Sequence, residues 1–309
     1  KYPLEYQLTL NNSCNLKCRM CDPWSSSSWI KEVKTYDYIE KASVGREPAD
    51  FPYKQPSSLG SLFMKDIDKW APYVRSLEAL GGEPLYSNAW YKLMDYLIDN
   101  DYAKNIDLAI VTNGTFFDKD VMNKLLTNFK SIGISLSIDG MGNIFEYLRS
   151  NAKWDKVKSN ILSYKELQPN TNLHLNYTYT VSWFNVLQIS DFLKFIKYEN
   201  FKTSIWLNKV NFPQWMSLPA APEALKPKLK ESLEKLKQEY LHDSSLRFEA
   251  EGLINFLNTK PPTTDEYLGF GQEILVLDKH REITTKDIVK HIDNQLVDNY
   301  LTTFGLNSI

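Results

Sequence analysis

The sequence predicts an α/β protein, a partial (β/α)6 TIM-like barrel followed by a mainly helical C-terminal extension. Its 309 residues, 43% of them hydrophobic, are enough to bury one large core. Through the first two thirds of the chain, short apolar or alternating runs are separated by segments with helical periodicity. This alternation implies a parallel sheet with right-handed crossovers. The six units fall short of the eight that close a full barrel, so we expect it to stay open.

The first four expected strands each lead into a loop of unusual composition. The first is followed by a group of cysteines, the second by Gly81-Gly82, the third by Thr112-Asn113-Gly114 and the fourth by Asp139-Gly140. Because the carboxyl ends of parallel strands meet at one edge of the sheet, we expect function at this edge. The expected strands are residues 6–10, 74–80, 105–111, 131–138, 173–181 and 203–210, and the helices between them are 89–99, 118–129, 154–167 and 186–198.

The chain divides into an expected barrel domain at residues 1–210 and an extension at 211–309. Residues 22–73 form an unusually long first crossover, which contains a helix-like segment at 30–42 and a proline-rich stretch at 47–56. Two tryptophans flank the serine run at its start, which favours a structured lid over a flexible linker. A purely structural interpretation is that Ser25 or Ser26 caps the next helix.

The extension begins with an extended connector and continues with a highly charged helix at residues 222–242. The simplest interpretation of this helix is a solvated face with ion pairs between successive turns. Further helices are expected to the end of the chain, around a possible strand at 273–277.

Every cysteine of the chain lies in one short segment, Cys14-x-x-x-Cys18-x-x-Cys21. A cubane iron-sulfur cluster held wholly by protein takes four thiolates, so three leave one iron open to a ligand. Zinc would need a fourth ligand from far downstream, where the candidates are His174, His242, His280 and His291. A disulfide would leave one cysteine over, and the third alternative is ordinary free thiols. The residues favour the open cluster without excluding zinc or plain thiols.

The cysteine spacing resembles that of the radical S-adenosylmethionine (SAM) superfamily, and Gly81-Gly82-Glu83-Pro84 matches the GGE motif of that family. Glycines there permit positive φ and the close approach of a ligand. The resemblance implies that Gly81, Gly82 and Glu83 receive the amino group of SAM, for which a carboxylate or a backbone acceptor is suited. As a bare turn, the same Gly-Gly pair would be weak support for binding.

The segment from Ser135 to Arg149 resembles the fourth strand of the family and the loop after it. There the resemblance implies that Ser137 and Arg149 address the carboxylate or ribose of SAM, and arginine suits this role through its fork of donors. The alternative is a plain turn followed by a solvated arginine. Less distinctive candidates are Thr112-Asn113-Gly114 and the group Thr180, Ser182 and Asn185.

The cysteine loop contains two further notable side chains, Arg19 and Met20. The family usually has an aromatic residue before the third cysteine, where this chain has Met20, a polarizable side chain that can fill similar space. Arg19 is interpreted as a solvated loop charge.

The resemblance implies a specific chemistry. Cys14, Cys18 and Cys21 would hold a [4Fe-4S] cluster that cleaves SAM reductively, giving a 5′-deoxyadenosyl radical that abstracts hydrogen from a substrate. In layout, the extension resembles the SPASM/twitch branch, but without the cysteines for an auxiliary cluster. That branch implies a peptide or protein side chain as substrate. A reductant such as flavodoxin or ferredoxin is the expected electron donor. Alternatives are a small metabolite, sugar or nucleotide as substrate, or a noncatalytic iron-sulfur electron-transfer or binding protein.

The composition of the chain argues against nucleic-acid and membrane partners. With 36 basic and 38 acidic side chains, the chain carries no field that would gather nucleic acid. It contains no apolar run of the roughly 18 residues needed to span a bilayer, so no membrane partner is expected. No charged-then-apolar leader is visible, and we expect a reducing cytoplasm, where free thiolates can hold iron.

Overall fold

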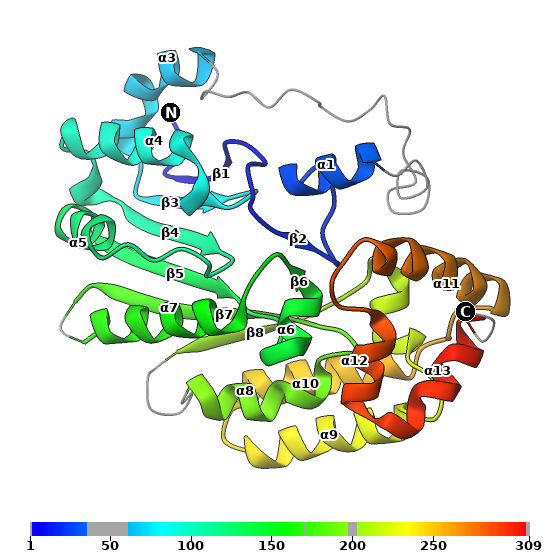
Figure 1. Cartoon of the computed structure of the whole chain (residues 1–309). Coiled ribbons are helices and arrows are strands. Elements are labelled where there is room, and N and C mark those ends of the chain that lie inside the picture. Colours follow the sequence, from blue (N-terminus) through cyan, green and yellow to red (C-terminus); the bar gives the residue numbers. More distant parts are fainter. Residues whose placement is uncertain (1, 36–60, 170, 197–202, 307–309) are drawn as a thin grey trace.

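The computed structural model describes residues 2–35, 61–169, 171–196 and 203–306 (Figure 1). The proline-rich stretch at 47–56 and much of the expected crossover 22–73 lie outside the described residues. At the start of that crossover, α1 (Ser27–Thr35) begins three residues before the expected helix. The Ser28 amide donates to Ser26 Oγ at 3.3 Å, as a capping serine accepts.

A six-stranded parallel sheet forms the centre of the molecule and confirms the predicted α/β fold. The strands lie in the order of the chain, so each crossover moves to the next position, as in a barrel that stays open. Alternating apolar residues, such as those of Ser-Ile-Gly-Ile-Ser-Leu-Ser in β5, give the strands after β1 one buried face, whereas the residues of β1 are only partly buried or exposed. The strands are β1 (Glu5–Thr9), β3 (Ser76–Leu80), β4 (Asp107–Thr112), β5 (Ser131–Ser137), β7 (Leu173–Val181) and β8 (Ser204–Lys209).

Helices cover one face of this sheet (Figure 1). The buried strand residues, for example Ile132 and Ile134 of β5, belong to the same core cluster as the apolar residues of these helices. Residues at the alternate strand positions are only partly buried, which leaves the other face of the sheet open. The covering helices are α3 (Ser61–Trp70), α4 (Asn88–Asp99), α5 (Lys119–Asn128), α7 (Trp154–Leu167) and α8 (Ile189–Ile196).

At the carboxyl ends of the strands lies a small antiparallel sheet of β2 (Lys17–Cys18) and β6 (Arg149–Ser150). Cys18 is paired with Arg149, and Lys17 with Ser150. The helix α6 (Gly142–Leu148) leads directly into β6. This sheet therefore ties the cysteine loop to the segment that follows β5.

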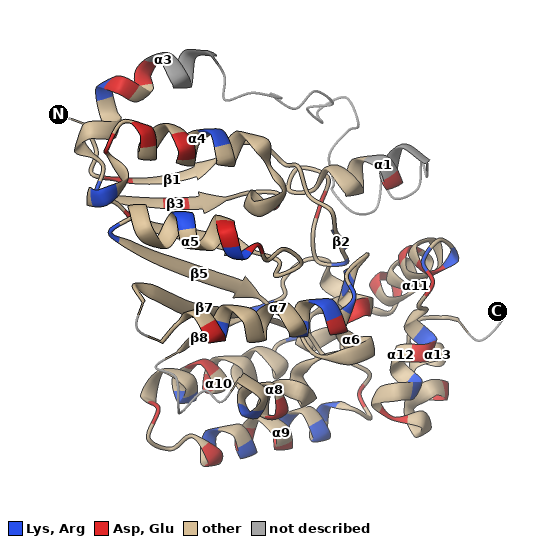
Figure 2. Ribbon diagram, turned by 60° about the vertical axis from the view of Figure 1, so that its left-hand side comes forward, with Lys and Arg blue, Asp and Glu red and all other residues tan. Residues whose placement is uncertain are grey.

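The extension is helical in its described part, as predicted. Both signs of charge alternate along α9, its charged helix (Figure 2). The predicted strand at 273–277 is wrong, because these residues lie in a helix that begins with a capping box at Thr263 and Glu266. A short apolar run has no period that separates strand from helix. The helices are α9 (Lys226–Glu239), α10 (Ser244–Leu257), α11 (Thr264–Lys279), α12 (Thr285–Ile292) and α13 (Val297–Thr303). Within the described residues, no helix has the length and hydropathy of a membrane span.

Candidate active site

The three cysteines lie on the loop after β1, at the carboxyl edge of the sheet, and all are free thiols. Nitrogen donors lie near two of the sulfur atoms. The Leu16 amide lies 3.5 Å from Cys14 Sγ, Asn113 Nδ2 lies 3.9 Å from the same atom, and Arg149 Nη1 lies 3.9 Å from Cys18 Sγ. Donors in these positions favour a sulfur atom that carries negative charge. The donor set thus fits thiolates bound to iron, the ligand type of iron-sulfur clusters.

Burial keeps these sulfurs protonated when they hold no metal. It raises the pKa of all three thiols, that of Cys18 to about 11 in spite of the nearby Arg149 cation. A metal centre would have to displace the protons. In the described ranges, no three His, Cys, Asp or Glu side chains gather as they would around a single metal ion. In a cubane each thiolate binds a different iron, so its ligands need not converge on one point.

The two glycines of the GGE motif let the cysteine loop come close. A Cβ on Gly82 would lie 2.3 Å from the Ser13 carbonyl oxygen, and one on Gly81 would lie 2.1 Å from the Thr9 side chain. Both glycines have positive φ, 77° and 54° for Gly81 and Gly82. The Glu83 amide donates to the same Ser13 oxygen at 2.7 Å. The motif therefore packs closely against the start of the cysteine loop and is hydrogen-bonded to it.

The Glu83 carboxyl group is fully buried and accepts hydrogen bonds from residues at the end of β4 and in the loop after it. It accepts from the Asn113 amide at 2.6 Å, from Thr112 Oγ1 at 2.9 Å and from the Leu85 amide at 3.0 Å. Burial raises the pKa of Glu83 to about 7 against the effect of these donors. The backbone of Asn113 is held in this way, and its side-chain amide points to Cys14 Sγ. The Thr-Asn-Gly loop, a weaker candidate from sequence, is thereby joined to both stronger motifs.

Arg149 is buried, and the alternative of a solvated arginine is wrong. Its guanidinium pairs with the buried Asp139 at 2.6 Å, and Nε has no hydrogen-bond partner within the described structure. Asp139 in turn accepts from the Thr180 amide at 2.7 Å, while Asn185 Nδ2 donates to the Asp139 carbonyl at 3.1 Å. Asp139-Gly140 is thus more than a plain turn, because it carries the counter-ion of Arg149.

The remaining candidates lie around this group. Ser137, at the end of β5, is partly buried and has no side-chain partner among the described residues. Ser182 is buried beside Asn185, which accepts from its amide at 2.8 Å. Met20 packs on the edge of the hydrophobic core.

Arg19, predicted to be a solvated charge, is wholly buried. Its Nη2 pairs with Asp278 Oδ1 of α11 at 2.9 Å and donates to the Ile283 carbonyl at 3.3 Å, and its guanidinium lies 4.0 Å from the centre of the Tyr147 ring. Asp278 also accepts from the Thr285 amide at 2.6 Å. The residue between two cysteines is therefore held by the C-terminal extension, although no sequence pattern relates these positions.

A second buried pair connects the same elements. Arg281 makes two contacts with Glu32 of α1, at 2.7 and 3.2 Å, and donates to Ser150 Oγ at 2.9 Å. It also lies over the ring of Trp29, whose Nε1 donates to the Cys18 carbonyl at 2.8 Å. Together, the Arg19 and Arg281 contacts hold the cysteine loop between α1, β6 and the turn after α11.

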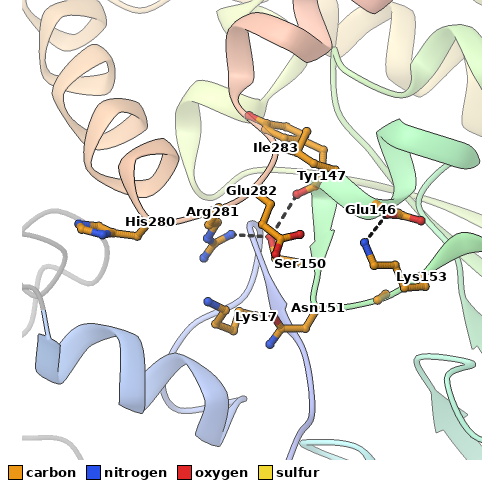
Figure 3. Close-up of a pocket in the computed structure, with 11 residues that line it drawn as sticks. Lys17, Glu146, Tyr147, Ser150, Asn151, Lys153, His280, Arg281, Glu282 and Ile283 are labelled. Carbon is orange, nitrogen blue, oxygen red and sulfur yellow. Dashed lines mark hydrogen bonds and ion pairs between the residues drawn. The ribbon is translucent and has the colours of Figure 1, made fainter.

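A cavity of about 380 Å³ opens beside this junction (Figure 3). Lys17 and Ser150 line it, whereas their strand neighbours Cys18 and Arg149 do not. Because successive side chains of a strand point to opposite faces, the β2–β6 sheet separates the cavity from the sulfur atom of Cys18. The cavity is thus distinct from the face that carries the thiol.

Comparison with known proteins settles the family. Residues 8–184, more than half of the chain, match the family described as the radical SAM superfamily. The chain belongs to the radical SAM superfamily. Proteins of this superfamily use a [4Fe-4S] cluster and SAM, the cofactors expected from the sequence.

Two curated relatives of this radical SAM protein each match about half of it. The radical SAM cyclopropyl synthase TigE of Paramaledivibacter caminithermalis is 26% identical over 54% of the chain, and the GTP 3′,8-cyclase of Aliarcobacter butzleri is 25% identical over 42%. Each match spans 33% of the relative's own length.

Solved structures were also compared with the chain. Native anSMEcpe with bound AdoMet gives a TM-score of 0.48 at 21% identity, covering 76% of this chain and 60% of that one. Streptococcus suis SuiB bound to the precursor peptide SuiA gives 0.46 at 17% identity, covering 88% and 52%.

Proposed function

We propose that Cys14, Cys18 and Cys21 hold a [4Fe-4S] cluster and that the protein is an enzyme that acts on a peptide or protein side chain. The observation that carries the cluster assignment is the group of three free thiols at the carboxyl edge of the sheet, with nitrogen donors beside Cys14 and Cys18. When bound, the cluster would supply the electron for the reductive cleavage of SAM, the chemistry that yields a 5′-deoxyadenosyl radical for hydrogen abstraction from the substrate.

The residues of the chain have positioning roles in this proposal. The backbone of Gly81, Gly82 and Glu83 offers acceptors for the amino group of SAM, because the Glu83 carboxylate itself is occupied by the neighbouring loop. Arg149 Nε, buried without a partner in the described structure, and the free hydroxyl of Ser137 are donors for the carboxylate or ribose of SAM.

The two parts of the chain have different roles in this proposal. Residues 1–210 would act as the catalytic domain, with the crossover 22–73 as its lid, and residues 211–309 as a twitch-like extension. A cytoplasmic flavodoxin or ferredoxin would supply the electron. The peptide substrate is proposed from the layout of the extension, which resembles the SPASM/twitch branch although it has no further cysteine.

A small metabolite or nucleotide is the second candidate substrate. The observation in its favour is the similarity to a relative that is a GTP cyclase. A noncatalytic iron-sulfur protein would use the cysteines without cleaving SAM, so the same experiment tests it.

The test is anaerobic reconstitution followed by reduction with dithionite in the presence of SAM. We expect about four irons and four sulfides per chain and the formation of 5′-deoxyadenosine. Replacing Cys14, Cys18 or Cys21 by Ala should abolish both signals, whereas replacing the exposed Lys279 by Ala should leave both unchanged. SAM cleavage by the triple cysteine variant, or one zinc in place of iron, would refute the proposal.

A further inference from the structure

One aromatic ring stands out on the open face of the central sheet. Trp206 of β8 is 57% exposed, while its strand neighbours Ile205 and Leu207 are buried on the opposite face. The open face is otherwise largely small or polar, as the alternate positions of the neighbouring strands show: Ala109, Gly133, Ser135, Asn176 and Thr178. Among the described residues, no aromatic side chain stacks on Trp206.

The strand register places this ring level with the candidate site. Ser137 of β5 is paired with Thr178 of β7, and Thr178 is paired with Trp206. Two strand spacings, about 10 Å, therefore separate Ser137 from Trp206 across the face. Asp139, two residues after Ser137, pairs with Arg149 beside Cys18. The ring thus lies about two strand spacings from Ser137, one of the residues proposed to hold SAM.

The surroundings of the ring favour a ligand that is flat and also polar. Gly133 and Ala109 add little side-chain volume to the face, so they leave room above the sheet. Hydroxyl and amide groups of Thr178 and Asn176 lie on the same face and can bond to ring substituents. Single apolar residues are common on outer surfaces, as Phe248 of α10 is here at 80% exposed. Trp206 differs because it lies on the open face of the sheet, at the same level as Ser137.

We propose that Trp206 is the stacking platform of the substrate site and that the group bound there is a planar ring with hydrogen-bonding substituents. This inference rests on the proposed function, since it concerns the substrate of the same enzyme. The ring can belong to an aromatic side chain of a peptide or to a nucleobase, because both present a flat π face to an indole.

Binding of two probes tests the proposal on the reconstituted protein with SAM and no reductant. The probes are N-acetyl-tyrosinamide for the peptide side chain and guanosine for the nucleobase, each followed by calorimetry. We expect Trp206→Leu to weaken the binding of one probe by about tenfold to a hundredfold, the range of a lost base–aromatic stack. Trp206→Phe keeps an aromatic ring. Its loss of probe affinity, expressed as the change in log Kd, should be less than about a third of the loss caused by Trp206→Leu.

The controls separate this idea from the proposed function. Phe248→Ala should leave probe binding unchanged, and N-acetyl-cyclohexylalaninamide should bind weakly to every variant because its ring is not planar. No reductant is present, so a protein that cannot cleave SAM still gives an answer about Trp206. Binding of neither ring probe to the native protein, or equal binding by the native and Trp206→Leu proteins, would overturn the inference.

Discussion

Removing Asp278 should destabilise the protein far more than removing a surface carboxylate. Its partner Arg19 has no exposed side-chain surface, and the two charged groups lie 2.9 Å apart. At an effective dielectric constant of about 20, their attraction is about 6 kcal/mol. The hydrogen bonds of Arg19 to the Tyr147 and Ile283 carbonyls do not involve Asp278, so we expect the variant to keep them. We therefore expect Asp278→Ala to lower the free energy of unfolding by about 3 to 5 kcal/mol, the usual cost of an unpaired buried charge.

The assay is urea unfolding of the anaerobic protein, with iron content as a second readout. The matched control is Asp95→Ala, because Asp95 pairs with Lys124 at the same 2.9 Å but both side chains are about half exposed. An exposed pair contributes at most about 1 kcal/mol. The double variant Arg19→Met with Asp278→Leu removes both charges and should recover most of the stability. Equal losses for Asp278→Ala and Asp95→Ala would refute the reasoning.

Three further changes have expected outcomes. Gly82→Ala should lower both iron content and SAM affinity, since its Cβ would meet the Ser13 carbonyl at 2.3 Å, whereas Gly269→Ala, with no atom within 4 Å of the added Cβ, should be neutral in both assays. Burial raises the pKa of Glu83 to about 7 from an unfolded value near 4.5, so its contribution to stability is complete below pH 4.5 and is lost as the pH rises through 7. This pH dependence amounts to about 3 kcal/mol of unfolding free energy between pH 4.5 and 7, and Glu83→Gln should remove it. A thermal-unfolding pH profile that is the same in the native and Glu83→Gln proteins would contradict this expectation. Arg149→Gln leaves a buried carboxylate without its cation and should cost about 3 to 5 kcal/mol in urea unfolding, so a loss below 1 kcal/mol would show that this pair behaves like an exposed one.

The regular elements were predictable because each signal lies within one element. The bounds of β7 and α7 agree with the predicted 173–181 and 154–167, since strict alternation and a long amphipathic period leave little ambiguity. The run at 273–277 failed because its apolar residues carry no period, and the capping box that starts the helix lies ten residues upstream. Local patterns thus predict elements well when their period is visible.

The candidate site was predictable only in part. The spacing of the three cysteines, and the resemblance of Gly81-Gly82-Glu83 to a family motif, predicted where the candidate site lies. The buried position of Arg19 depends on a partner 259 residues away, which a motif cannot encode. The engagement of the Glu83 carboxylate with Thr112 and Asn113 is similarly a tertiary fact, because it depends on how two neighbouring strands end.

The separation between Arg19 and Asp278 has a consequence during synthesis. At about 5 to 20 residues per second, the ribosome needs roughly 13 to 50 seconds to advance the 259 positions from Arg19 to Asp278. Throughout that interval the nascent cysteine loop has no C-terminal carboxylate to hold it. The contact between the cysteine loop and α11 therefore forms only after most of the chain has been made.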